Sequence, residues 1–155
     1  MPSVLQKDET LTAVAVIRTS PDRLYSLISD VTRIPEWSPE VVRVQRLTDD
    51  TFRSWNRRRL GRWKTDARIV AAEPGRRFSF VVDVLGGDWT QWTYELEPVG
   101  DDTRLTLHFR MCVAMPAAVL MFERLALFVM DRRTDLQANM DTSVQRITAI
   151  AESDS

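Results

Sequence analysis

The chain has 155 residues, 44% of them hydrophobic and 28% charged, and its 21 basic and 22 acidic residues give a net charge of −1. This length supports one domain with a sizeable core, so we expect a single domain over residues 1–155 with its core from about 9 to 152. With 5 glycines and no repeat or low-complexity run, the composition excludes collagen-like, solenoid and disordered chains. The near-neutral charge also predicts that nucleic acid is not a partner.

Cysteine use and the N-terminal residues indicate the compartment. The one cysteine, Cys112, cannot form an internal disulfide, and residues 1–9 lack the basic and apolar pattern of a signal peptide. We therefore expect a cytoplasmic protein. The segment Val113–Met130 is almost wholly apolar, but it contains Glu123 and Arg124, whose charges are costly in lipid. This pattern favours a helix that covers an apolar surface over insertion into a membrane.

The first elements follow from β-branched residues and helix caps. The segment Thr10–Arg18 is rich in β-branched residues and predicts a strand. The segment Ser20–Asp22 supplies an N-cap, a proline at the first helical position and an acid in the first turn, which together predict a helix. A second cap at Asp30 predicts another short helix, which we expect Pro35 and Pro39 to end.

From Val41 to Cys112 the hydrophobic period becomes two, and turn residues recur at short intervals. Short turns make neighbouring strands antiparallel, so we expect a meander of about six strands. The positions expected to face inward are Phe52, Ser54, Asn56, Arg58, Trp63, Thr65, Phe80, Trp92, Tyr94 and Phe109. The same alternation places the only histidine, His108, on the outer face together with Trp55 and Trp89.

The pattern is helical again from Pro116 to Glu152. A straight helix of that span would be roughly 55 Å long. A domain of this size is only about 40 Å across, so we expect a break near residues 131–134. In the second part an apolar stripe is expected to lie on the sheet, formed by Leu136, Met140, Val144, Ile147 and Ile150. The predicted architecture is α+β, with one curved antiparallel sheet and a long C-terminal helix.

The residue types restrict the chemistry that the chain can perform. One histidine and one cysteine cannot supply a conventional zinc site or a Cys–His dyad, and no nucleotide-binding motif is present. The inward aromatic residues, with a few hydroxyl and amide groups among them, fit either a packed core or a cavity for an apolar ligand. The basic residues of Arg57–Arg59, Arg62 and Lys64 are divided between two faces, which favours a solvated hairpin over a nucleic-acid surface.

Several segments of the chain resemble one known family. Those that carry the resemblance are Asp30–Val42 (DVTRIPEWSPEVV), Phe52-x-Ser54-x-Asn56, Glu73–Phe78 (EPGRRF), Trp92–Leu96 (WTYEL) and Gly100–Thr106. They are similar to the START-like, or SRPBCC, superfamily, specifically its polyketide cyclase/dehydrase-like branch, over nearly the whole chain. The resemblance implies a helix-grip fold, in which a seven-stranded antiparallel curved sheet wraps around a long C-terminal helix and two short helices follow the first strand.

The same resemblance implies a deep cavity between the sheet and the C-terminal helix. Trp37 would then lie at or near its entrance, and Val113–Met130 would serve as a wall or lid. Aromatase/cyclases of this superfamily are thought to polarise a poly-ketone with a pocket arginine. The arginine that matches by position, Arg68, has outward parity here. Arg58 has inward parity and lies two residues beyond Asn56, so it is the better candidate for an oxyanion anchor at the cavity mouth.

We therefore expect a protein that binds a hydrophobic, polyketide- or lipid-like small molecule, with no cofactor and no metal. The expected ligand-binding residues are Trp37, Phe52, Ser54, Asn56, Trp63, Thr65, Phe80, Trp92, Tyr94 and Phe109. If the protein is an enzyme, we expect a cofactor-independent cyclase or dehydratase in which Asn56 and Arg58 are catalytic. The alternative is a non-catalytic structural or interaction module, a homodimer formed through the outer sheet face that carries Trp55 and Trp89.

Overall fold

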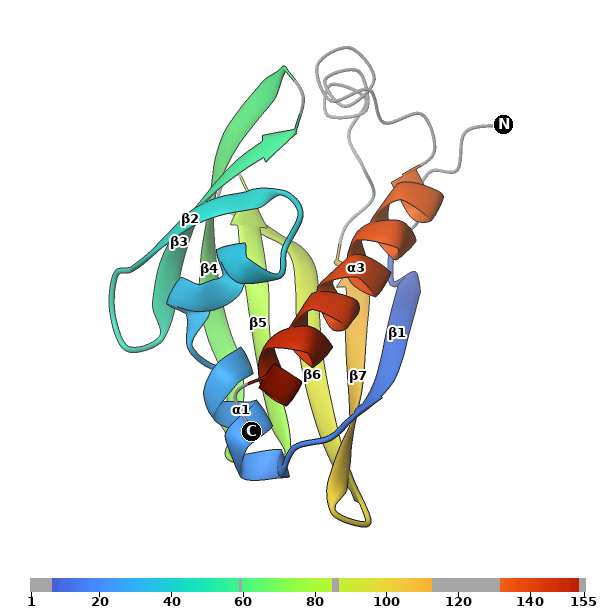
Figure 1. The fold of residues 1–155 in the computed structure, drawn as a ribbon. Helices are drawn as coiled ribbons and strands as arrows, with labels where there is room; N and C mark the ends of the chain where they lie inside the picture. The colour runs from blue at the N-terminus through green and yellow to red at the C-terminus, as the bar shows by residue number, and fades with distance from the viewer. Residues whose placement is uncertain (1–6, 59, 85–86, 113–131, 154–155) are drawn as a thin grey trace.

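The structure, a computed structural model, describes residues 7–58, 60–84, 87–112 and 132–153. Its elements are β1 (Thr10–Ile17), α1 (Pro21–Ile28), η1 (Val31–Glu36), β2 (Val41–Arg46), β3 (Thr51–Arg58), β4 (Gly61–Glu73), β5 (Arg77–Val84), β6 (Gly87–Val99), β7 (Asp102–Met111) and α3 (Arg132–Ser153). The predicted α+β class is confirmed, because one sheet carries all these strands and the helices lie on its concave side (Figure 1).

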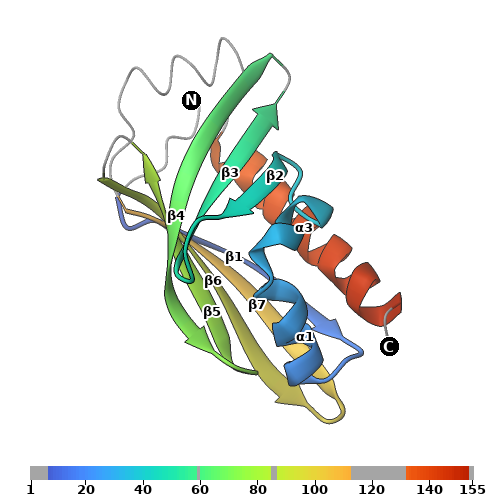
Figure 2. The same cartoon turned by 90° about the vertical axis from the view of Figure 1, so that its left-hand side faces the viewer.

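The sheet has seven strands in the order β1-β7-β6-β5-β4-β3-β2, and the neighbouring strands are antiparallel. Strands β2 to β7 form the predicted meander, and β1 pairs with β7, so that β1 and β2 are the two edges. The sheet curves, and α3 lies across its concave side with α1 and η1 beside it (Figure 2). This is the helix-grip arrangement that the family resemblance implies.

Local capping explains where the two short helices begin. The hydroxyl of Ser20 accepts a hydrogen bond from the amide of Arg23 at 3.3 Å, and the carboxylate of Asp30 accepts one from the amide of Thr32 at 3.2 Å. The prediction that a proline ends the second helix was wrong for Pro35, which lies inside η1. A proline removes only one hydrogen bond from so short a 3₁₀ helix, so the helix tolerates it.

The core lies between the concave face of the sheet and one side of α3. The inward side chains of β7 are almost completely buried, namely Leu105, Leu107, Phe109 and Met111. On α3 the predicted stripe is buried at Leu136, Met140, Val144 and Ile147. Ile150 is only partly buried, and Ala151 completes the stripe instead. The covering helix predicted at Val113–Met130 lies outside the described residues.

Candidate functional site

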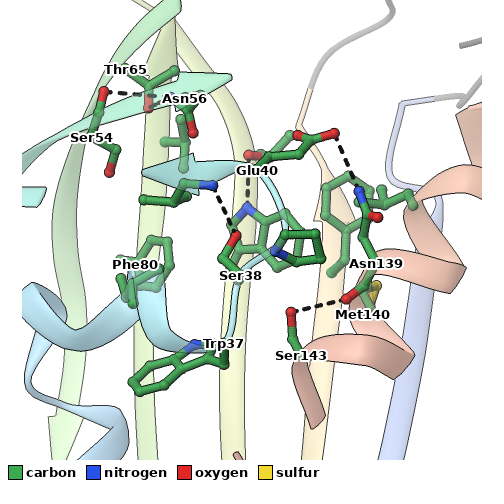
Figure 3. A pocket seen from close by; sticks show the side chains of 18 of the residues that line it. Trp37, Ser38, Glu40, Ser54, Asn56, Thr65, Phe80, Asn139, Met140 and Ser143 are labelled. Carbon is green, nitrogen blue, oxygen red and sulfur yellow. Dashed lines mark hydrogen bonds between the residues drawn. The ribbon is translucent and has the colours of Figure 1, made fainter. Parts of the chain in front are cut away.

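A cavity of about 330 Å³ lies between the concave face of the sheet and α3. Its lining comes from η1 and the loop after it, from β2 to β7 and from the first half of α3. Figure 3 shows Ser54, Asn56 and Thr65 on one side of the cavity and Met140 and Ser143 of α3 on the other. The residues predicted to bind ligand all line this cavity, namely Trp37, Phe52, Ser54, Asn56, Trp63, Thr65, Phe80, Trp92, Tyr94 and Phe109.

Small polar side chains keep this space from filling. Ser54, Thr65 and Thr90 occupy inward positions of the sheet, and Ser143 occupies the facing side of α3. A leucine or phenylalanine at these positions would extend into the cavity, because protein interiors otherwise pack to nearly crystalline density. The cavity is therefore encoded by the size of a few side chains on the concave face.

Aromatic rings form much of the apolar lining. Phe52 meets Phe80 edge to face, with ring centroids 5.2 Å apart and ring planes at 77°. Trp92 meets Phe109 in the same way, at 5.0 Å and 66°. Such contacts hold the rings in defined orientations, so the apolar walls are pre-organised surfaces rather than a set of mobile side chains.

Asn56 is the best-defined polar group of the lining. Its amide nitrogen donates to the carbonyl oxygens of Ser54 and Trp63 at 3.4 and 3.3 Å, and to the hydroxyl of Thr65 at 3.4 Å. Because carbonyl oxygens only accept hydrogen bonds, these contacts fix the amide with its nitrogen toward the sheet. Within the described residues the amide oxygen of Asn56 has no donor, which leaves it as an acceptor for a ligand.

Trp37 and Tyr94 form a second polar contact in the lining. The indole Nε1 of Trp37 donates to the Tyr94 hydroxyl at 3.4 Å. Burial raises the pKa of Tyr94 to about 12, although the hydrogen bond from Trp37 acts in the opposite direction. Trp37 was expected at or near the cavity entrance, but only 1% of this residue is exposed, so it is a buried part of the lining and does not lie at the entrance itself. Its indole N–H can be buried there because the Tyr94 hydroxyl serves as its acceptor.

Trp89 also lines the cavity, although strand parity predicts that it points outward. The pairing of β5 with β6 shifts at this point, since Val82 pairs with Thr90 whereas Asp83 pairs with Asp88. Trp89 is therefore the extra residue of a bulge, which turns its side chain to the concave face. The tryptophans that line the cavity are thus Trp37, Trp63, Trp89 and Trp92.

The loop after η1 and helix α3 supply polar lining that strand alternation could not reveal. Glu40 follows η1, and its carboxylate accepts a hydrogen bond from the side-chain amide of Asn139 at 3.2 Å. On α3, Asn139 and Ser143 lie four residues apart, beside Leu136 and Met140 of the buried stripe. That helical spacing is the signal by which these two α3 residues could have been found.

Arg58 has the predicted inward parity, but it lies outside the lining of this cavity. Its guanidinium donates to Asp135 at the start of α3 at 2.8 Å and to Glu40 at 3.3 Å. These three side chains are each less than one-fifth exposed. Together with Asn139, Arg58 instead lines an adjoining hollow between the β2–β3 edge and α3, which shares Pro39, Glu40 and Asn139 with the cavity. Its positive charge is thus already matched by two carboxylates.

Arg68, the arginine that matches the family by position, has the outward parity expected from the sequence. Its guanidinium donates to Asp83 at 3.2 Å and to Asp88 at 3.0 Å, and 42% of its side chain is exposed. His108 is also on the outer face, with Nε2 3.3 Å from a carboxylate oxygen of Glu95. Neither residue lines the cavity.

The sequence matches the model of a family described as polyketide cyclase/dehydrase and lipid transport, over residues 8–152. The chain belongs to this family. No curated protein matches the chain. The family description covers both chemistry and carriage, so the membership is specific for the fold and broad for the function.

Solved structures of similar fold agree with the family. The aromatase/cyclase Zhui from Streptomyces sp. R1128 is 12% identical at a TM-score of 0.72, with 93% of each chain covered. The di-domain ARO/CYC StfQ of the steffimycin pathway is 18% identical at 0.71, over 94% of this chain and 51% of StfQ. A START superfamily protein from Mycobacterium smegmatis is 14% identical at 0.67, over 94% and 99%. At these identities the likeness shows the START-like fold, which confirms the sequence resemblance.

The described residues provide neither a metal site nor a membrane-spanning helix. Among the described residues, no group of three or more metal-ligating side chains is positioned to hold an ion. No helix in the described part of the chain is long and apolar enough to cross a membrane. The segment Val113–Met130, for which the sequence raised the question of insertion, lies outside the described residues.

Proposed function

We propose that this member of the family binds one hydrophobic, partly oxygenated small molecule, polyketide- or lipid-like, in the cavity between the sheet and α3. The observation that carries the proposal is the cavity itself, whose 330 Å³ is lined by aromatic rings in mutual edge-to-face contact and by a few short polar side chains. Small-molecule sites are typically concave, mostly apolar and about 300–1,000 Å³ in volume. The family description, which names polyketide chemistry and lipid transport, supports the same class of ligand.

Two groups would orient the ligand. The amide oxygen of Asn56 can accept a hydrogen bond from a ligand hydroxyl. The Tyr94 hydroxyl accepts from Trp37 and has no acceptor of its own among the described residues, so it can donate to a ligand carbonyl. With its pKa near 12, Tyr94 stays protonated and remains a donor at neutral pH. A ligand with both a carbonyl and a hydroxyl group therefore suits this lining best.

The position of Arg58 favours binding over cyclisation as the primary function. A cyclase of the kind expected from the resemblance needs a cation that stabilises a developing enolate oxygen. Arg58 contacts Glu40 and Asp135 instead, and their charges would have to be displaced before it could meet a substrate. Lys64 is a cation among the residues that line the cavity, but its pairing with Trp55 places it in an outward-facing row of the sheet. The catalytic roles of Arg58 and Asn56 stay predictions. The alternative of a dimer through the outer sheet face is less well supported, because the two tryptophans that suggested it have other contacts. Trp89 lines the cavity, and Arg43 stacks on Trp55.

Titration with the neutral apolar dye Nile red tests this proposal with one matched pair of variants. Thr65→Leu adds the same side chain to the cavity that Thr12→Leu adds to the exposed outer face of β1. We expect saturable, one-to-one binding by the wild-type protein and by Thr12→Leu, and at least a tenfold loss of affinity in Thr65→Leu. Equal affinities in both variants, with unchanged circular dichroism, would show that the dye does not enter this cavity.

A further inference from the structure

The outer face of β2, β3 and β4 carries a local concentration of positive charge. Arg43 pairs across β2 and β3 with Trp55, Trp55 pairs across β3 and β4 with Lys64, and Arg57 pairs with Arg62 in the next row of the sheet. These four cations are exposed and lie around Trp55, and together we call them the outer cationic patch; Lys64 also borders the cavity on the other side of the sheet. The whole chain has a net charge of only −1, so the patch is a feature of this face and not of the composition.

The patch differs from the rest of the outer face in that its cations form no ion pair among the described residues, although Asp66, which pairs with Arg53, lies near enough to Lys64 to feel its charge. Other arginines on that face do have acidic partners, such as Arg53 with Asp66, Arg68 with Asp83 and Asp88, Arg77 with Glu73, Arg104 with Glu97, and Arg110 with Asp8. In the part of the chain that the structure describes, no carboxylate lies within ion-pair distance of any cation of the outer cationic patch. The charge there is therefore available to an anionic partner.

Exposed apolar side chains accompany the patch. Leu60, in the turn that joins β3 to β4, is 77% exposed, and it lies between Arg57 and Arg62 in the sequence. Val42, at the β2 edge, is 53% exposed and lines with Arg57 the hollow between the β2–β3 edge and α3 described above. The hairpin of β3 and β4 projects beyond the end of β2, away from α1, so its tip can reach a flat surface (Figure 2).

We propose that the outer cationic patch and Leu60 dock the protein onto an anionic lipid surface. Cations gathered beside a projecting leucine and a tryptophan match a bilayer interface, where anionic headgroups lie above an apolar layer. The opposite side of the same strands supplies Asn56 and Trp63 to the cavity, so docking would bring one cavity wall close to the bilayer. The inference goes beyond the proposed function, and it does not depend on which molecule fills the cavity.

A lipid surface fits this face better than single-stranded nucleic acid does. Nucleic-acid surfaces of this kind stack bases on exposed aromatic rings. Here the guanidinium carbon of Arg43 lies 4.4 Å from the Trp55 ring centroid, where a base would have to stack. An aliphatic side chain at the hairpin tip also has no role in contacts with phosphates, whereas it can enter the boundary between headgroups and acyl chains.

Vesicle sedimentation tests the proposal with variants matched in charge. Arg57→Gln/Arg62→Gln removes two cations of the patch, and Arg23→Gln/Arg146→Gln removes two exposed cations of α1 and α3, so both variants change from a net charge of −1 to −3. The probes are phosphatidylcholine vesicles and vesicles in which about a third of the lipid is phosphatidylglycerol. Circular dichroism melting of each variant tests whether the fold is kept.

We expect the wild-type protein to bind the anionic vesicles, and less so at high salt. The patch variant should bind about 30-fold more weakly, because each basic side chain near an anionic surface accounts for about a fivefold gain. The Arg23/Arg146 variant should bind like the wild type, and Leu60→Ser should weaken binding about tenfold. The proposal is overturned if anionic vesicles are not bound, if both charge variants lose affinity equally, or if a single-stranded oligonucleotide binds while vesicles do not.

Discussion

The indole nitrogen of Trp37 donates a hydrogen bond to the hydroxyl of Tyr94 inside the cavity, across 3.4 Å. The two residues come from different parts of the fold, the end of η1 and the middle of β6, and both are almost completely buried. The contact satisfies the indole N–H and leaves the tyrosine as a donor toward the cavity. The same hydrogen bond therefore holds the end of η1 against the sheet and orients the Tyr94 hydroxyl in the cavity.

The raised pKa of Tyr94 predicts a loss of stability in alkali. The folded pKa, about 12, is above the unfolded value of about 10, so the protonated form is favoured in the folded state. This contribution to stability is fully present below pH 10 and is lost as the pH rises toward and beyond 12, by up to about 3 kcal/mol. Chemical denaturation at several pH values should show this fall in the wild-type protein. The Tyr94→Phe variant should lose less stability over the same pH range, because the contribution of Tyr94 is absent. Parallel curves for the two proteins would contradict the burial of Tyr94.

Asn56 is predicted to serve the ligand more than the fold. Asn56→Ala removes the acceptor that faces the cavity and three long hydrogen bonds of 3.3–3.4 Å. We expect ligand affinity to fall about tenfold, which corresponds to one good hydrogen bond, with a loss of about 1 kcal/mol in unfolding free energy. Dye titration and urea denaturation measure the two effects. A loss of stability without a loss of affinity would assign Asn56 a structural role.

Arg58 is predicted to stabilise the docking of α3. Arg58→Met leaves the carboxylates of Glu40 and Asp135 close together without their shared cation. We expect a loss of about 2 kcal/mol in unfolding free energy, since partly buried charges are costly when unpaired.

A second substitution separates this role from simple loss of packing. The variant Arg58→Met/Asp135→Asn should be more stable than Arg58→Met alone, because one of the two opposed carboxylates becomes neutral. Urea denaturation of the two single variants and the double variant measures the coupling. Strictly additive effects would indicate that the ion pairs contribute nothing to stability.

The tryptophans should report ligand binding unequally. Trp92 lines the cavity beside Phe109, whereas Trp55 lies on the outer face under Arg43. Binding of an apolar ligand should change the intrinsic fluorescence, and Trp92→Phe should reduce this change while Trp55→Phe leaves it nearly intact. If Trp55→Phe removes the response, the ligand binds to the outer face instead.

Much of the cavity could be predicted because strand alternation is a local property. Once Asn56 and Trp92 are assigned inward parity, their strand neighbours follow at every second position. Trp89 escaped this reasoning, because a bulge inserts one residue into the pairing and no turn residue marks it.

Long-range partners were the other missing information. Arg58 has the predicted parity, but its role depends on Asp135, which lies 77 positions further along the chain. The depth of Trp37 likewise depends on Tyr94, whose position only the closed sheet determines. Periodicity thus identifies the face of a residue, whereas burial and charge pairing depend on the three-dimensional packing.

Native mass spectrometry tests the central claim most directly. The wild-type protein, after incubation with an equimolar amount of Nile red, should carry one small molecule per chain, either the dye or a ligand retained through purification. Thr65→Leu, with its cavity partly filled, should show mainly the mass of the bare chain, while Thr12→Leu should resemble the wild type. Bare chains in all three samples would contradict the account, because an open cavity with this lining should hold an apolar molecule.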